Sequence, residues 1–537
     1  MTIISEKIPR PWGHVMALAI LLLLCALPSL YHGIARDALA NSDMDLVSVY
    51  QALLINSNQP LVHNAHTGFG YFLSLAGWFN ALHFFGVLPV NDMDSLMASK
   101  NFDAAYLSLV VAGRWFAIFQ AWVFIGLVNF SIYSFLKEYE WGIWATFILS
   151  IALVIGGGGI PSQSFMLRTE LLSMILIYAS AMALIAAPNV TITRSYWLLG
   201  LTGLLIHLAL MVKIQNIIVI LFLPLLPLVF GKWKRKDFSI LKKQKMNWAI
   251  PIIAVILITP ITILFIDNIA PDSHIYFHGL ILIYIAICAF IYSYLNLGAV
   301  RYGIVGLSAI AIGFVLSFGL FLFHKDWWTF YAIVNFLDHL LIYSPASTVL
   351  PNKATEFTVV LQSIIKMAPT IEIFRFFDER FRNLDYPFMV FYILVPAAIF
   401  LLALKKNWEV AIKAGFLCLM AGLIVGIFWI GRGFFNFYYS IYVEVWIILA
   451  LAIVLKYLHK ISNFQNPRWI FLGSSVFFIL IASVIIFNVR NRLLEPSTAN
   501  PVVAYSTCFI RGLTPLFYTK FNNYCGSTWA KPLNFRR

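Results

Sequence analysis

Long apolar runs, repeated along most of the chain, restrict its possible folds more than any other sequence feature. A helix needs about 20 apolar residues to cross the hydrocarbon core of a bilayer. Thirteen candidate spans cover residues 14–31, 105–136, 142–157, 168–187, 196–212, 214–231, 248–267, 276–297, 303–323, 387–404, 412–430, 438–456 and 469–487. Only 11% of all residues are charged, compared with about 25% in soluble proteins. The sequence therefore predicts an all-α polytopic membrane protein with about 13 transmembrane helices.

The distribution of basic residues predicts the topology. The net charge is +14, and the lysines and arginines lie mostly between the apolar runs, as expected for cytoplasmic loops rather than for a nucleic-acid-binding protein. With a cytoplasmic N-terminus, six spans place the basic block at residues 232–236 in the cytoplasm. Residues 68–86 are also apolar, but one more crossing would move that block outside. We therefore expect 68–86 to lie in the membrane interface, as one of the interfacial helices of the first outer loop.

The N-terminal apolar run raises the question of a cleaved signal peptide. It follows Lys7 and Arg10, and Ala38-Leu-Ala40 has the small residues of a signal-peptidase site. A cleavage site normally follows the apolar region closely, whereas here a polar stretch with Arg36 intervenes. We expect an uncleaved first span.

The same topology defines the segments outside the cytoplasm. Outer loops at 32–104 and 324–386 belong to a transmembrane domain over residues 1–487, and 488–537 form a short extracytoplasmic tail. In an oxidising compartment Cys508 and Cys525 could form a disulfide worth roughly 3 kcal/mol. The cytoplasmic loops contain neither a P-loop nor a GxGxxG motif. Any chemistry is therefore expected on the outer face.

The first outer loop contains closely spaced carboxylates. Ser42 and Asp45 have the spacing of a capping box, and apolar residues at helical intervals predict a short amphipathic surface helix starting near Ser42. Alternatively, Asp43 and Asp45 provide a general base or part of a divalent metal site. The pair Asp92 and Asp94 is interpreted as part of a solvated loop. For His63 and His66, no third ligand follows at helical spacing, which favours hydrogen bonding to the protein or to substrate over metal binding.

Further along, charged residues stand at the outer ends of spans. Four glycines at 156–159 allow irregular backbone near a ligand, and Arg168 and Glu170 then open the next span. These two residues form either an interfacial salt bridge or part of a site.

Two more cations interrupt apolar sequence near the outer headgroups. Lys213 stands with Gln215 and Asn216 at a turn, and Arg432 follows a span. Each could extend toward lipid phosphates. Together with Arg168, they could instead surround a phosphate ligand.

The order of these motifs resembles the GT-C superfamily of membrane glycosyltransferases, especially the protein O-mannosyltransferases and lipid A aminoarabinose transferase. The matching motifs are Asp43-Met-Asp45 after the first span, the aromatic segment from His66 through Tyr71 to Phe85-Gly86, Gly113-Arg114 early in the second span, and Arg168-Thr-Glu170. The likeness covers residues 1–230 best. Met44 separates two aspartates where the family often has adjacent Asp-Glu, and His66-Thr-Gly replaces a common Lys-Pro-Pro or His-Pro-Pro.

The resemblance implies an inverting transfer of a sugar from a polyprenyl-phosphate donor to a glycan, lipid or protein acceptor. Asp43 would be the general base, and Asp45 would orient the acceptor. Asp43, Asp45 and Glu170 are the candidate ligands for a divalent Mg or Mn ion. The implied substrate contacts are Glu170, Arg168, Lys213, Arg432, His66, Tyr71 and Arg114.

The expected location is a bacterial cytoplasmic (inner) membrane, with membrane lipid as a partner, no nucleic acid, and the active site on the periplasmic face. Two other functions fit the sequence. A transporter or flippase of a lipid-linked sugar or solute would also be polytopic, although no internal repeat is evident. A polysaccharide polymerase or ligase would use the charged outer loop 324–386.

Overall fold

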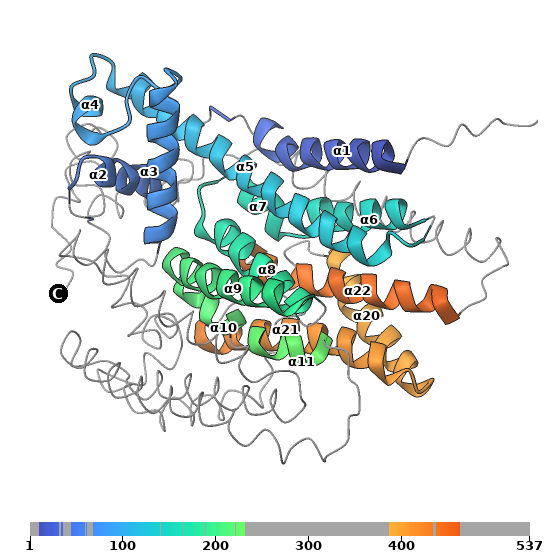
Figure 1. Cartoon of the computed structure of the whole chain (residues 1–537). Helices are drawn as coiled ribbons and strands as arrows, with labels where there is room; N and C mark the ends of the chain where they lie inside the picture. The colour runs from blue at the N-terminus through green and yellow to red at the C-terminus, as the bar shows by residue number, and fades with distance from the viewer. Residues whose placement is uncertain are drawn as a thin grey trace, which may run out of the picture. The chain divides into compact units, whose positions relative to one another are not determined.

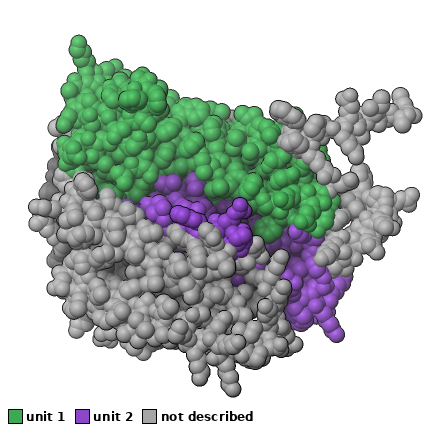
Figure 2. All heavy atoms as spheres, viewed as in Figure 1, with its two compact units in different colours: residues 1–171, 464–537 green, residues 172–463 purple. Residues whose placement is uncertain are grey.

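The computed structural model describes residues 10–31, 34–35, 45–59, 61, 68–139, 141–164, 166–187, 190–220, 222–230, 386–432 and 437–461. Within these ranges the regular elements are helices, and there is no strand. The chain forms two compact units (Figure 2): unit 1 contains residues 1–171 and 464–537, and unit 2 contains residues 172–463. The predicted spans at 248–267, 276–297, 303–323 and 469–487, and the charged loop 324–386, lie outside the described residues.

Three helices of the described part are long and apolar enough to cross a membrane. They are α5 (Phe102–Leu136), α8 (Thr169–Ala186) and the Trp408–Gly426 part of α21 (Trp408–Arg432). Shorter apolar helices accompany them in both units. The chain is therefore a membrane protein whose described part is all-helical, as the apolar runs predict.

Unit 1 contains an antiparallel group of helices. Helix α1 (Arg10–Tyr31) packs against α5, and α5 packs against α6 (Gly142–Ile151). The Trp122 indole N–H donates to the Leu22 carbonyl at 2.8 Å, and the Asn129 amide donates to the Ser150 hydroxyl at 3.0 Å, so polar side chains connect both pairs. These helices match the predicted spans 14–31, 105–136 and 142–157.

After α6 the backbone becomes irregular, as the four glycines predict. A π-helical turn covers Ala152–Gly156, Gly157 is extended, and α7 (Gly159–Ser164) follows. The Ser29 hydroxyl at the end of α1 donates to the Ser164 carbonyl at 2.7 Å. The chain between α6 and α8 is thereby held against the C-terminal end of α1.

The first outer loop folds into a helical layer on the N-terminal part of α5. Helix α5 has 35 residues and is roughly 50 Å long, well beyond the thickness of about 30 Å that it must cross. It contacts α3 (Phe69–Phe84) and α4 (Met93–Met97), and α2 (Val47–Asn56) packs on both. In Figure 1, α3 runs across the direction of α1, which is the direction an interfacial helix takes.

Helix α2 differs from the prediction of an amphipathic surface helix starting near Ser42. Every residue from Val47 to Leu54 is buried, so the helix has no solvated face over that stretch. The physical reason is tertiary, because α3, α4 and α5 all contact α2. Asp45 lies in a π-helical turn before α2 and pairs with Arg114, whereas Ser42 lies outside the described residues, so the predicted capping box stays a prediction.

Asp92, interpreted from the sequence as part of a solvated loop, is the N-cap of α4. Its carboxylate accepts from the Ser95 N–H at 2.7 Å, and the Ser95 hydroxyl completes a capping box. Replacing Asp92 with Ala should destabilise α4 by about 0.5–2 kcal/mol, while Asn at the same position accepts the same bond and should retain most of it. Hydrogen–deuterium exchange of residues 93–99 measures this. If amide exchange were equally faster in the Ala and Asn variants, Asp92 would not act as the N-cap of α4.

Unit 2 contains most of α8, which starts in unit 1, together with α9 (Ile192–Val212), α20 (Tyr386–Leu404), α21 and α22 (Ile441–Ile461). Helices α20, α21 and α22 pack on one another. The predicted spans 168–187, 196–212, 387–404, 412–430 and 438–456 therefore correspond to helices.

The predicted span 214–231 is not one continuous helix. It consists of a 3-10 turn at Ile214–Asn216, α10 (Ile217–Ile220), a second 3-10 turn at Leu223–Leu225, and α11 (Leu226–Phe230). Pro224 and Pro227 explain the second interruption, because proline lacks the N–H that a continuous helix requires and clashes with the preceding turn. The predicted span is therefore helical but interrupted, and its crossing of the membrane stays a prediction.

Candidate active site

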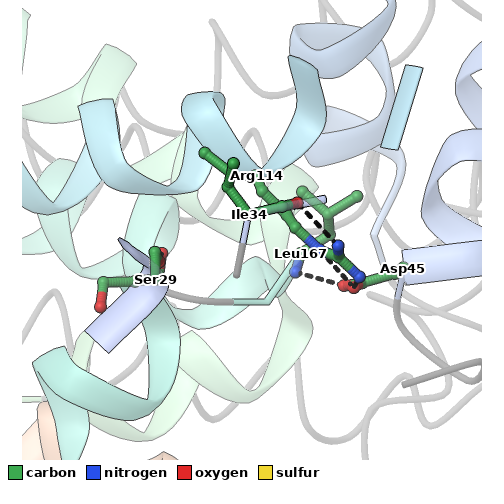
Figure 3. Close-up of polar contacts among 6 residues, drawn as sticks. Ser29, Ile34, Asp45, Arg114 and Leu167 are labelled. Carbon is green, nitrogen blue, oxygen red and sulfur yellow. Dashed lines mark hydrogen bonds and ion pairs between the residues drawn. The ribbon is translucent and has the colours of Figure 1, made fainter. Parts of the chain in front are cut away.

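The centre of the candidate site is a buried ion pair between Asp45 and Arg114 in unit 1 (Figure 3). The Arg114 Nε and Nη2 atoms donate to the same carboxylate oxygen, Oδ2, at 3.1 and 2.8 Å. The side chains are 1% and 0% exposed for Arg114 and Asp45, respectively. Arg114 comes from α5, and Asp45 lies just before α2.

Both side chains also bond to backbone groups from other segments. The second Asp45 oxygen, Oδ1, accepts from the Leu167 N–H at 2.9 Å, and Arg114 Nη1 donates to the Ile34 carbonyl at 2.8 Å. The pair therefore connects the segment after α1, the start of α2, helix α5 and the segment before α8. Such additional hydrogen bonds offset the cost of removing two charges from water.

Gly113 allows this close packing. A Cβ atom at Gly113 would lie 2.9 Å from Leu167 Cδ1, closer than real Cβ contacts. The Gly113-Arg114 pair noted in the sequence thus has two distinct roles. The glycine makes room for Leu167, and the arginine binds the carboxylate that accepts the Leu167 N–H.

A second ion pair stands at the start of α8. Arg168 Nε lies 3.4 Å from Glu170 Oε2, and the Arg168 Nη1 group also contacts the Met166 sulfur at 3.7 Å. The Glu170 side chain is 1% exposed and that of Arg168 is 10% exposed. Of the two alternatives open from the sequence, the ion pair is present. Because it is buried, it is more than a solvated surface contact.

Tyr71 on α3 completes the group. Its side chain is 0% exposed, and its ring packs against Phe72 and Phe116, with centroids 6.3 and 6.1 Å away. Burial raises the pKa of the Tyr71 phenol well above 10.0, and the nearby carboxylates of Asp45 and Glu170 raise it further. Tyr71 is therefore neutral at physiological pH.

This pKa shift predicts a loss of stability in alkali. The unfolded chain ionises Tyr71 above pH 10, whereas the folded chain keeps the proton, so the folded state becomes less stable as the pH rises through that range. Relative to a Tyr71→Phe variant, the free energy of unfolding of the wild-type protein should fall by up to about 1.4 kcal/mol per pH unit above pH 10. Thermal unfolding of both proteins in detergent between neutral pH and pH 11 measures it. A stability difference that is independent of pH would contradict the shift.

Unit 2 contains a separate polar network at the break after α9. The Ser173 hydroxyl donates to Asn216 Oδ1 at 2.6 Å and lies 2.9 Å from the Tyr442 hydroxyl, while the Asn216 amide donates to the Ala209 carbonyl at 2.5 Å. All three side chains are buried. The network joins α8 and α22 to the end of α9. It also provides a hydrogen bond to the Ala209 carbonyl, near the residue where α9 ends.

Lys213 lies at this break in extended backbone. Its side chain is only 5% exposed, and its ammonium group stands 5.6 Å from the ring centroid of Tyr439. A cation at this distance from an aromatic ring is favourable. Lys213 is therefore buried within the described part of the protein.

The structure thus brings five of the predicted site residues together in unit 1: Asp45, Arg114, Arg168, Glu170 and Tyr71. Lys213 belongs to unit 2. Arg432 is the last residue of α21, and Asp43 and His66 lie outside the described residues. The roles predicted for these four residues stay predictions.

The described residues do not form a metal site by themselves. They contain no group of three His, Cys, Asp or Glu side chains that could hold an ion. Asp45 and Glu170 are each bonded to an arginine instead. Metal binding by Asp43, Asp45 and Glu170 stays a prediction.

Sequence reasoning missed several participants. The Leu167 N–H and the Ile34 carbonyl are backbone groups, which give no sequence signal. Ser173 and Tyr442 are common residues within apolar helices, and only the packing of α8 beside α22 reveals their contact. Asn216 could be identified from the sequence, because it stands with Lys213 and Gln215 in an otherwise apolar stretch.

Comparison of the chain with family models, with curated proteins and with solved structures finds no match. The functional interpretation therefore depends on the contacts described above and on the resemblance in sequence. The observations establish a helical membrane protein with a buried, charged and polar cluster in unit 1.

Proposed function

We propose that this membrane protein is a glycosyltransferase that moves a sugar from a polyprenyl-phosphate donor to an acceptor on the extracytoplasmic face. One observation supports this most strongly. Asp45, Tyr71, Arg114 and the Arg168–Glu170 pair come from the four sequence motifs that carry the GT-C resemblance, and these residues meet in one buried cluster of unit 1. Residues so far apart in sequence would have no reason to converge if each motif were merely a local cap or lipid contact.

The position of the cluster suits chemistry at a membrane surface. It lies where α1 ends and α5 extends beyond the length needed to cross a bilayer, next to the helical layer formed by the first outer loop. A lipid-linked donor reaches such a site from the bilayer, and an acceptor reaches it from the aqueous side. By the charge-based topology, this is the periplasmic face of a bacterial inner membrane.

The proposed reaction inverts the anomeric centre. Asp43 takes the proton from an acceptor hydroxyl or amine, whose oxygen or nitrogen forms a bond to the anomeric carbon. The bond from that carbon to the phosphate oxygen breaks, and polyprenyl phosphate leaves with its electron pair. Asp45, held by Arg114, fixes the chain that carries Asp43. Glu170 binds substrate, and Arg168 stabilises the phosphate charge. The same role, which the resemblance implies for Lys213 and Arg432, stays a prediction.

A transporter or flippase of a lipid-linked sugar is the second candidate, because one observation favours it. The interrupted helix from Lys213 to Leu225 carries a buried polar network, and broken helices at membrane depth are common where transporters bind substrate. The polymerase or ligase alternative depends on loop 324–386, which lies outside the described residues.

A single assay separates the candidates. Purified protein in proteoliposomes receives polyprenyl-phosphate sugars labelled in the sugar, together with membrane extracts as the source of acceptor. Label appearing in a new product, with release of polyprenyl phosphate, supports the glycosyltransferase. Movement of intact labelled donor between leaflets without cleavage supports the transporter. No cleavage with any donor sugar, in protein shown to be folded, would reject the glycosyltransferase.

A further inference from the structure

The turn between α20 and α21 has a lysine where the backbone favours glycine. Lys406 has a φ of +61°, in the left-handed region that residues with a Cβ atom rarely adopt. The Asn407 N–H donates to the Leu402 carbonyl at 3.0 Å. The Lys406 N–H donates to the Ala403 carbonyl at 2.9 Å. These two bonds form a Schellman motif, in which the position of Lys406 is usually occupied by glycine.

The same motif ends two other helices of the described part, and there it has the residues that tolerate this backbone best. Gly86, with a φ of +72°, follows α3, and Asn58, with a φ of +53°, follows α2. In each motif the next residue donates its N–H to the carbonyl five positions earlier, at 2.9 Å. Lysine at position 406 therefore has a conformational cost that glycine would avoid. A backbone outlier of this kind suggests that the side chain has a role of its own.

The lysines of this turn are accessible. Lys405 and Lys406 are both exposed, and neither forms an ion pair with an acid among the described residues. The next residue, Asn407, accepts a hydrogen bond from the Tyr457 hydroxyl on α22. The turn is thus fixed to a neighbouring helix, while its two ammonium groups remain available to a ligand.

Exposed apolar side chains flank the two lysines. Leu401 and Leu404, at the end of α20, are 58% and 63% exposed. Trp408 and Ile412, at the start of α21, are 60% and 56% exposed. The Trp408–Gly426 stretch is long and apolar enough to cross a membrane, so lipid is the expected cover for these side chains. Because tryptophan is enriched at membrane–water interfaces, Trp408 indicates that the turn lies at the level of the lipid headgroups.

The charge of the turn selects one class of lipid. Lysines close to the membrane surface attract anionic headgroups, which the cytoplasmic leaflet contains, and the charge-based topology places this turn in the cytoplasm. The dipole of α20 also favours a cation at its C-terminal end, but that interaction is the same in neutral and in anionic lipid. A dependence on the headgroup therefore distinguishes a lipid site from a favourable helix end.

We propose that the α20–α21 turn binds the phosphate of an anionic lipid headgroup through Lys405 and Lys406. The exposed apolar side chains beside the lysines contact the acyl chains of the same lipid. Binding of the phosphate offsets the conformational cost of a lysine at position 406. The site belongs to unit 2, and it is independent of the proposed sugar transfer.

The first test compares unfolding temperatures in nanodiscs of phosphatidylcholine with those in nanodiscs that also contain phosphatidylglycerol. The anionic lipid should raise the unfolding temperature of wild type. Lys406→Gly should be at least as stable as wild type in the neutral discs, because glycine adopts a positive φ without strain, yet phosphatidylglycerol should stabilise it less. Lys406→Arg keeps the charge and should respond as wild type does. An equal response of wild type and Lys406→Gly, or no response of wild type, would overturn the proposal.

The second test measures binding directly, by native mass spectrometry of the protein in detergent with added phosphatidylglycerol. The double variant Lys405→Gln with Lys406→Gly should bind the lipid roughly 25-fold more weakly than wild type, about five-fold for each lysine. Lys137→Gln is the matched control, because Lys137 is an exposed lysine at the end of α5 with an ordinary backbone conformation. It should bind the lipid as tightly as wild type.

Three outcomes of the binding experiment would overturn the proposal. Unchanged affinity in the double variant would show that the lysines do not bind the lipid. An equal loss in Lys137→Gln would show general attraction between charges without a site at this turn. If soluble glycerol phosphate displaced the lipid at equal concentration, the ligand would be a free phosphate and not a lipid.

Discussion

Replacing Asp43 with Asn is expected to lower the rate of sugar transfer by roughly 10²–10⁴, the usual contribution of a general base. Asparagine has nearly the same shape but cannot take the proton from the acceptor. Because the base acts in the transition state, kcat should fall while the KM for the donor changes little. Initial rates with labelled polyprenyl-phosphate sugar, at varied donor concentration, measure both constants.

Asp94→Asn is the matched control for this experiment. Asp94 belongs to the same outer loop, is exposed on α4, and undergoes the same change of charge. It should transfer sugar at the wild-type rate. If Asp43→Asn also keeps nearly the wild-type rate while remaining folded and membrane-inserted, Asp43 is not the base. Asp45 and Glu170, the two acids of the described cluster, would then be tested next.

Removing the Arg114 side chain is expected to cost about 3–5 kcal/mol of stability, because it leaves the Asp45 carboxylate buried without its counter-charge. Arg114→Ala should unfold at a much lower temperature in detergent. The segment around Leu167 should also exchange its amide hydrogens faster, because the Leu167 N–H is bonded to Asp45. Faster exchange near Leu167 would show that the loss of stability comes from the broken ion pair and not from unfolding of the whole protein.

Two comparisons make the Arg114 prediction specific. Lys413→Ala removes a cation from a pair with Glu409 that is largely exposed, and should cost only about 0.3–0.5 kcal/mol. The double variant Asp45→Leu with Arg114→Met removes both charges of this pair and should recover part of the stability lost in Arg114→Ala. If Arg114→Ala were no worse than Lys413→Ala, the ion pair would not hold this part of unit 1 together.

The helical content of the described part was predictable because it depends on local composition. Apolar runs of sufficient length must form helices in lipid, where every backbone group needs a partner within its own segment. The same reasoning located α1, α5, α8, α9 and the helices of residues 386–461. It did not reveal the interruption of the helix within 214–231, where Pro224 and Pro227 lie in mostly apolar sequence. Apolarity alone does not reveal such a break.

The candidate site was predictable only as a list of residues. The sequence indicated Asp45, Arg114 and Glu170, and it could not show that Asp45 would bind Arg114, 69 positions away, or that a Leu167 backbone N–H would join them. The spacing of Ser42 and Asp45 suggested a capping box because such boxes are local patterns. The bond between Asp45 and Arg114 depends on packing between distant segments, which local spacing does not show.

The sequence by itself therefore determined that this chain is a membrane protein, that its spans are helical, and that charged residues are located at the ends of those spans. These properties depend on the transfer of each segment between water and lipid. Only the tertiary structure decided which charges pair and where α9 stops. Those outcomes depend on contacts between distant segments, whose free energies no local pattern contains.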